Sequence, residues 1–270
     1  MILGLSSYTY GWAIGVAGYP PARPLTEQDL LDRARRHRVS LVQVCDNLPL
    51  HQLSSERLTA FAERAAREAI ALEVGSRGLT LPHAMEMIAL ARRVGARLIR
   101  FVIDGPEHHP ERREVIDVLR RLVPALDGLT LGIENHDRRP ARELRSIVEA
   151  VDSERVGICL DTANSLGAGE GLACVVGTLA PFTVNLHLKD FQIARVPHLM
   201  GFTVEGRPAG AGMLDVPWLL EQLAPFGRCR TAVLELWTPP EADLASTIAR
   251  EESWVEQSLN YLKPLFKARA

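Results

Sequence analysis

The segment L-T-L-G-I-E-N-H-D, residues 129–137, alternates between two kinds of side chain. The first kind is aliphatic and consists of Leu129, Leu131 and Ile133. Between them stand Thr130, Gly132, Glu134 and His136. A period of two predicts a β-strand with one face packed under a helix and a different opposite face. That opposite face ends in a carboxylate and an imidazole, so the ionisable groups lie at the C-terminal end of the strand.

The same pattern occurs three more times, in Val156–Thr162, Val184–Asp190 and Thr231–Trp237. The aliphatic positions of these segments are Val156, Ile158 and Leu160, then Val184, Leu186 and Leu188, then Ala232, Leu234 and Leu236. The opposite face of each segment presents one metal-binding type of residue near the same end. We therefore predict that four residues form one site, namely Glu134, Asp161, His187 and Glu235.

Strand patterns alternate with helical patterns along the whole chain. The other strand patterns are Ile2–Tyr8, Leu41–Cys45, Glu73–Arg77 and Arg97–Asp104. Helical patterns cover 26–38, 54–72, 82–94, 110–126, 140–151, 169–179, 215–224 and 247–266. Eight β-α units predict an α/β fold, a single (β/α)8 TIM barrel domain over residues 1–270. A doubly wound open sheet is the alternative, but residues 6–12, S-S-Y-T-Y-G-W, lack its glycine fingerprint.

Composition narrows the class of partner and the compartment. A net charge of −2 over 270 residues gives no electrostatic reason to expect nucleic acid. The four cysteines show no C-x-x-C spacing, which favours a reducing, cytoplasmic compartment. No apolar run is long enough to span a bilayer, and the N-terminus lacks the basic region of a signal peptide. We expect a cytoplasmic protein with a small-molecule partner and no membrane.

Three carboxylates and one imidazole cannot all remain charged and unpaired in a barrel lumen. A divalent cation resolves the conflict, and mixed oxygen and nitrogen ligands favour Mn²⁺ first, with Mg²⁺, Co²⁺ or Zn²⁺ as alternatives. A reading without metal stays open, because Lys189 and Arg100 can supply the counter-charges and His187 alone can be a core histidine.

Five motifs, in this order and spacing, resemble the xylose isomerase-like TIM-barrel superfamily. They are I-E-N-H (133–136), C-L-D-T-A-N-S (159–165), N-L-H-L-K-D (185–190), G-A-G-M-L-D-V-P-W (210–218) and L-E-L-W (234–237). That superfamily includes sugar phosphate isomerase/epimerases, ketose 3-epimerases, inosose dehydratases and AP endonuclease family 2-like enzymes. The resemblance implies that Glu134, Asp161, His187 and Glu235 hold the metal. It also implies that Glu134 and Glu235 act as acid and base.

Two departures from the family pattern limit the resemblance. Ketose 3-epimerases usually carry a substrate-binding histidine where this chain has Asn164. The DNA-repair branch needs extra histidines for a zinc cluster, and the corresponding strand ends here offer Gln43, Cys45 and Arg77.

The chemistry that such a site supports passes through an enediolate stabilised by the metal. We predict a metal-dependent enzyme of sugars or sugar acids, with isomerisation or epimerisation as the first reading. Decarboxylation or dehydration of an oxo-sugar acid or an inosose-like substrate is the alternative at the same site. A sugar-binding barrel without catalysis is the third.

Several further side chains are candidates to bind the substrate. Arg100, Arg77, His136 and Lys189 share the lumen-facing register and form a cationic ring suited to a carboxylate or phosphate, unless they only neutralise the carboxylates. The remaining candidates are Asn164, the stacking residues Trp12 and Trp237, and Arg207. Arg207 lies in the loop Arg195–Gly212, which we expect to close over the substrate. The family often pairs barrels, so a homo-oligomer is a further expectation.

Overall fold

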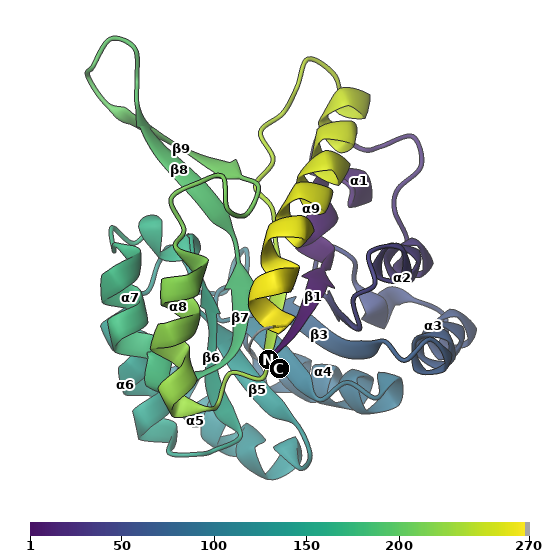
Figure 1. Cartoon of the computed structure of the whole chain (residues 1–270). Coiled ribbons are helices and arrows are strands. Elements are labelled where there is room, and N and C mark those ends of the chain that lie inside the picture. Colours follow the sequence, from purple (N-terminus) through teal and green to yellow (C-terminus); the bar gives the residue numbers. More distant parts are fainter. Residues whose placement is uncertain (268–270) are drawn as a thin grey trace.

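The computed structural model describes residues 1–267 and contains a closed barrel of eight parallel strands (Figure 1). The barrel strands are β1 (Ile2–Ser6), β2 (Leu41–Val44), β3 (Ala71–Arg77), β4 (Leu98–Val102), β5 (Thr130–Glu134), β6 (Val156–Asp161), β7 (Thr183–Leu188) and β10 (Thr231–Leu234). Around the barrel they follow the order β1-β10-β7-β6-β5-β4-β3-β2. The prediction of a (β/α)8 TIM barrel is confirmed.

Helices cover the outside of the barrel (Figure 1). They are α2 (Glu27–Arg36), α3 (Ser55–Arg67), α4 (Leu81–Val94), α5 (Arg112–Leu122), α6 (Ala141–Val151), α7 (Leu172–Leu179), α8 (Val216–Leu223) and α9 (Leu244–Lys267), with a short α1 (Gly11–Ile14) after β1. Their starts follow the sequence: Thr26 and Asp29 form a capping box on α2, and Asp215 caps α8. None of the described helices is long and apolar enough to cross a membrane.

One predicted helix is too long. The helical pattern 54–72 ends at Arg67, because Ala69 adopts a left-handed backbone with φ of 54° and turns the chain. Leu72 then belongs to β3, where it is buried.

The strand face predicted for Val184 is wrong. The register between β6 and β7 shifts at Ile158/Cys159, and the partners pass from Thr183 to Asn185, so Val184 has no partner on β6. Its side chain enters the lumen next to Gly132 and Gly157. A Cβ built on Gly157 would lie 2.5 Å from Val184 Cγ1, and one built on Gly132 would lie 3.4 Å from Val184 Cγ2. The bulge therefore fills the lower lumen with an aliphatic group.

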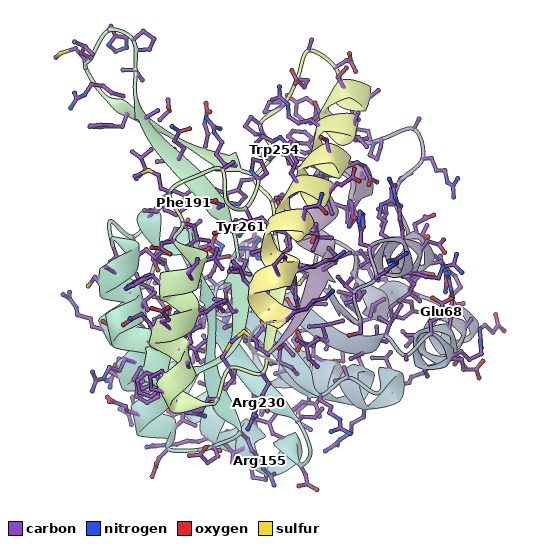
Figure 2. The ribbon with its side chains drawn as sticks, viewed as in Figure 1. Glu68, Arg155, Phe191, Arg230, Trp254 and Tyr261 are labelled. Atoms are coloured by element: carbon purple, nitrogen blue, oxygen red, sulfur yellow. The ribbon has the colours of Figure 1, made fainter. Side chains whose placement is uncertain are left out.

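The predicted loop Arg195–Gly212 is instead largely a hairpin. Strands β8 (Asp190–Arg195) and β9 (Phe202–Arg207) pair antiparallel and project from the barrel at the upper left of Figure 1. Asp190 fixes its base, because its carboxylate accepts hydrogen bonds from the backbone of Gly210, Gly212 and Leu214. Tyr261 of α9, labelled in Figure 2, lies against Gly210 at the base of the hairpin. Val204, Glu205 and Gly206 of β9 line a cavity at the mouth of the barrel, so closure of this segment over a substrate stays a prediction.

Candidate metal centre and active site

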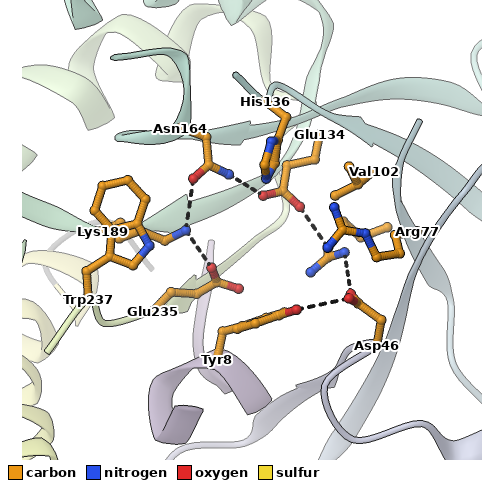
Figure 3. A pocket seen from close by; sticks show the side chains of 11 residues that line it. Tyr8, Asp46, Arg77, Val102, Glu134, His136, Asn164, Lys189, Glu235 and Trp237 are labelled. Atoms are coloured by element: carbon orange, nitrogen blue, oxygen red, sulfur yellow. Dashed lines mark hydrogen bonds and ion pairs between the residues drawn. The ribbon is translucent and has the colours of Figure 1, made fainter. Parts of the chain in front are cut away.

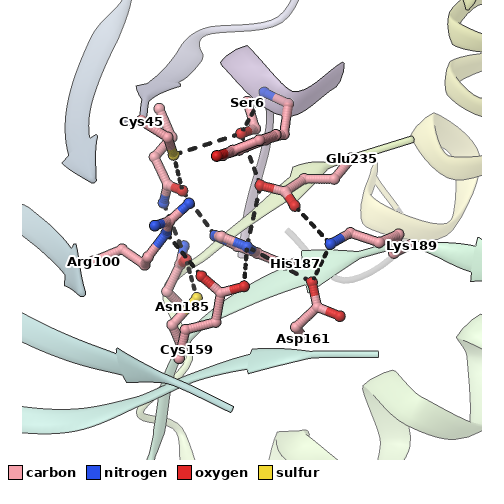
Figure 4. A network of polar contacts seen from close by, with 12 residues as sticks. Ser6, Cys45, Arg100, Cys159, Asp161, Asn185, His187, Lys189 and Glu235 are labelled. Atoms are coloured by element: carbon pink, nitrogen blue, oxygen red, sulfur yellow. Dashed lines mark hydrogen bonds and ion pairs between the residues drawn. The ribbon is translucent and has the colours of Figure 1, made fainter. Parts of the chain in front are cut away.

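The four predicted ligands come together at the C-terminal mouth of the barrel, with Asp161, His187 and Glu235 labelled in Figure 4 and Glu134 in Figure 3. Glu134 and Asp161 end β5 and β6, His187 lies on β7, and Glu235 follows β10; each is at most 4% exposed. His187 Nδ1 lies 3.2 Å from Glu235 Oε1, 3.7 Å from Glu134 Oε1 and 4.0 Å from Asp161 Oδ2. A shared register on parallel strands thus produces one cluster of ligand atoms.

The two ring nitrogens of His187 have different surroundings. Nε2 lies 2.7 Å from Gln43 Oε1, and an amide oxygen only accepts, so Nε2 carries the proton. Nδ1 has no well-formed hydrogen bond although it is fully buried. A buried nitrogen aimed at three carboxylates is the donor arrangement that a divalent cation requires.

Two permanent cations are built into the cluster. Lys189 Nζ lies 2.8 Å from Asp161 Oδ2 and 3.1 Å from Glu235 Oε2. Arg100 Nε lies 2.8 Å from Glu134 Oε2, and its Nη1 lies 3.1 Å from Asp46 Oδ1. Four carboxylates therefore face two cations in this ion-paired cluster, which leaves two negative charges. A bound divalent cation balances them.

Charge pairing keeps the two glutamates ionised. Burial alone would raise the pKa of Glu134, but Arg100 and His187 lower it to about 2. Burial also opposes ionisation of Glu235, and His187 and Lys189 hold its pKa well below the ordinary value. Both side chains therefore suit ligation, because a ligand must be deprotonated.

The pKa of the His187 imidazole shifts in the opposite direction, upward. Burial lowers its pKa, but Cys159, Glu235 and Glu134 outweigh burial and raise it well above the ordinary value. Without a metal the proton on Nδ1 serves as the local counter-ion. A divalent cation would replace that proton, so metal binding should release it. The residues present fit a metal site on charge, donor type and geometry.

Neighbouring polar groups fix the ligands in place. Asp161 Oδ1 accepts hydrogen bonds from the backbone N–H groups of Ala163 and Asn164, both at 2.8 Å. The Asn164 amide donates to Glu134 Oε1 at 2.8 Å and accepts from Lys189 at 3.3 Å. Asn164 therefore joins three members of the cluster, which is more than the substrate contact predicted from sequence.

Five other residues of the site escaped the sequence prediction. Ser6 donates to Glu235 Oε1 at 2.8 Å, and the hydroxyl of Tyr8 donates to Asp46 at 2.9 Å. Gln43 holds His187, and Asn135 ties the ends of β5 and β6 together. The signal available in the sequence was their position at the ends of strands one, two and five, where lumen-facing polar groups gather.

A cavity of about 310 Å³ opens directly above the cluster (Figure 3). Its lining is Tyr8, Asp46, Arg77, Arg100, Val102, Glu134, His136, Asn164, Lys189, Glu235 and Trp237. Six predicted substrate contacts are among these residues, namely Arg77, Arg100, His136, Asn164, Lys189 and Trp237. The Lys189 ammonium lies 5.0 Å from the centre of the Trp237 ring, so this indole forms a wall beside the ion pairs.

Two predicted substrate contacts lie elsewhere. Trp12 lines an adjoining cavity of about 850 Å³, which shares Tyr8, Arg77 and Trp237 with the first, and its indole donates to the backbone oxygen of Thr238. The Arg207 guanidinium donates to Gln192 and Glu205 on the hairpin and lines neither cavity.

Comparison with known proteins shows which protein family the chain matches. The model of the Xylose isomerase-like TIM barrel family matches residues 31–265. A 3-oxo-isoapionate decarboxylase from Pectobacterium atrosepticum is 33% identical over 264 residues, covering 97% of this chain and 95% of the relative.

Two solved structures share the fold at low identity. One is a Xylose isomerase-like TIM barrel protein from Mycobacterium smegmatis in complex with magnesium, with 15% identity, a TM-score of 0.70, and coverage of 96% of this chain and 97% of the other. The second is D-psicose 3-epimerase with D-tagatose from Clostridium cellulolyticum H10, with 13% identity, a TM-score of 0.71 and 97% coverage of both chains. These likenesses show the fold alone.

Proposed function

The chain belongs to the Xylose isomerase-like TIM barrel family, and we propose that it is a divalent-metal-dependent decarboxylase of a 3-oxo sugar acid. The observation that carries this proposal is the 33% identity, along nearly the full length of both chains, to a 3-oxo-isoapionate decarboxylase. It favours the alternative reading of the sequence over isomerisation or epimerisation. The cationic cavity supports the proposal, because the substrate carries a carboxylate.

The metal would be held by Glu134, Asp161, His187 and Glu235. When bound, a divalent cation polarises the 3-oxo group and stabilises the negative charge that develops on its oxygen. The chain positions the cation with ionised carboxylates and excludes bulk water by burying all four side chains. Asn164 and Lys189 orient the carboxylates from the cavity side.

The reaction itself makes modest demands on proton transfer. The bond between the carboxylate carbon and C2 breaks, its electron pair passes toward the 3-oxo group, and CO₂ leaves as a neutral molecule. No base has to remove a proton from carbon, which agrees with glutamates whose pKa values are low and which are weak bases. A protonated group must then supply a proton to C2. On the cavity wall, Lys189 and Tyr8 both carry protons, and burial raises the pKa of Tyr8.

The experiment offers the protein two kinds of substrate after elemental analysis has shown which metal it carries. With 3-oxo-isoapionate in D₂O, we expect one CO₂ to be released per substrate and one deuterium to be incorporated at the product carbon. NMR measures both changes. Chelation should abolish the reaction and Mn²⁺ should restore it. Epimerisation of a ketohexose such as D-psicose without CO₂ release from the oxo acid would overturn the proposal in favour of an isomerase/epimerase.

The Glu134→Gln variant separates catalysis from simple binding. It removes one charge from the cluster at almost constant volume, and we expect loss of turnover. If wild type and variant both bind the sugar acid equally and neither releases CO₂, the barrel is a binding protein.

A further inference from the structure

The cations that face the active-site cavity differ in whether they are already engaged. Arg100 is almost fully buried and is held by Glu134, Asp46 and the backbone oxygen of Ser76. Lys189 is held by Asp161 and Glu235. Recruiting either for a substrate would break a buried ion pair and leave a carboxylate without its counter-charge.

His136 is engaged as well. Its Nδ1 lies 2.6 Å from Asp137 Oδ1 at the cavity rim. This contact lowers the pKa of the Asp137 carboxyl, so that carboxylate neutralises any positive charge on the imidazole.

Arg77 is different. It ends β3, its side chain is exposed, and within residues 1–267 no hydrogen bond or ion pair engages its guanidinium. It influences Asp137 only through longer-range electrostatics. Figure 3 shows it among the side chains that line the cavity. Because it also lines the adjoining cavity, it stands where the two cavities meet.

The barrel order defines what Arg77 faces. In the closed sequence β1-β10-β7-β6-β5-β4-β3-β2, strand β3 lies four places from β7 in both directions. Arg77 and the ligand His187 therefore stand on opposite sides of the lumen. A substrate long enough to span the cavity would reach the His187 side of the cluster at one end and Arg77 at the other.

Resting on the proposed function, we propose that Arg77 anchors the substrate carboxylate, across the cavity from the ligand His187. A guanidinium presents two parallel N–H donors that match a carboxylate. Binding there requires no buried ion pair to break, unlike binding at Arg100 or Lys189. The site thus selects sugar acids over neutral sugars through one residue on β3.

The proposal has a kinetic consequence. The carboxylate is an anion in the bound substrate and becomes neutral CO₂ as the C–C bond breaks, with the electron pair staying on the rest of the substrate. The interaction with Arg77 is therefore strongest before the reaction and weakens during it. Arg77 therefore stabilises the bound substrate at least as much as the transition state, so its loss should raise KM without lowering kcat.

The test compares Arg77→Gln, Arg77→Lys and the control Arg142→Gln, an exposed arginine on the outer helix α6. For Arg77→Gln we expect KM for the 3-oxo acid to rise about 10- to 100-fold, the range for a charged hydrogen bond, with kcat unchanged or higher. Arg77→Lys should recover part of the affinity, and Arg142→Gln should match wild type. An unchanged KM, or a fall in kcat alone, would overturn the assignment.

Calorimetry tests the anchor without turnover. The probes are D-erythronate, a sugar acid, and erythritol, its neutral counterpart. We expect Arg77→Gln to weaken D-erythronate binding and to leave erythritol unaffected; equal effects on both would overturn the anchor. A wild type that releases no CO₂ but still shows this selective loss would refute the decarboxylase proposal and leave the carboxylate anchor standing.

Discussion

The barrel lumen holds two buried polar layers that are satisfied in different ways. The lower layer contains one carboxyl, Glu73, which accepts hydrogen bonds from the amides of Gln43 at 2.9 Å and Asn185 at 3.3 Å. The upper layer contains three carboxylates, the His187 imidazole and two ion-paired cations. Both layers are almost fully buried, so solvent exposure does not account for the difference.

Hydrogen bonding completes the lower layer but not the upper one. Burial raises the pKa of Glu73, and the neutral amides of Gln43 and Asn185 donate hydrogen bonds to its carboxyl. This layer therefore needs no cation to balance it. In the upper layer charged partners lower the glutamate pKa values, and His187 Nδ1 has no well-formed hydrogen bond. The buried carboxyl of the lower layer therefore has a structural role, whereas the carboxylates of the upper layer are arranged to bind a cation.

The largest effect should follow removal of one charge from the upper layer. For Asp161→Asn we expect metal affinity to fall by at least about 100-fold, beyond the loss that outer-shell changes cause. CO₂ release should disappear with the metal. Elemental analysis and a Mn²⁺ titration followed by electron paramagnetic resonance measure the loss.

The matched control makes the same change in the lower layer. Glu73→Gln also converts a buried carboxyl to an amide, and we expect it to keep about one metal per chain. If both variants lost the metal equally, the two layers would not be functionally distinct.

A smaller effect should follow cutting the link between the layers. Gln43 accepts from His187 Nε2 at 2.7 Å and donates to Glu73 at 2.9 Å, so it fixes the imidazole orientation from below. For Gln43→Leu, which removes the acceptor, we expect metal affinity to fall about 10- to 100-fold. Unchanged affinity in the same titration would show that the Gln43 contact does not orient the ligand.

The upper layer was predictable from sequence because its members repeat one local pattern. A period of two fixes which side chains face the lumen, and parallel strands bring their C-terminal ends together. That reasoning reached Glu134, Asp161, His187 and Glu235 without any knowledge of neighbours.

The link between the layers was not predictable in the same way. Gln43 on β2 meets His187 across the lumen, 144 positions later, and that pairing depends on how the strands are staggered when the barrel closes. The inward turn of Val184 depends on a local register shift that strand alternation hides. Periodicity gives the face of a side chain but not its partner on the far wall.

The smallest effect should appear in the stability of the lower layer. Because the pKa of Glu73 is raised by burial, the folded state holds a proton that the unfolded chain releases once pH exceeds about 4.5. The free energy of unfolding should therefore fall as pH rises from the unfolded pKa to the raised folded pKa, by about 1.4 kcal/mol for each pH unit between them. Glu73→Gln removes the titrating group while its amide oxygen can still accept from Gln43 and Asn185. Urea unfolding at pH 5 and pH 8 should show a smaller loss of stability in Glu73→Gln than in wild type, and an equal loss would mean that Glu73 is ionised and paired like the carboxylates above it.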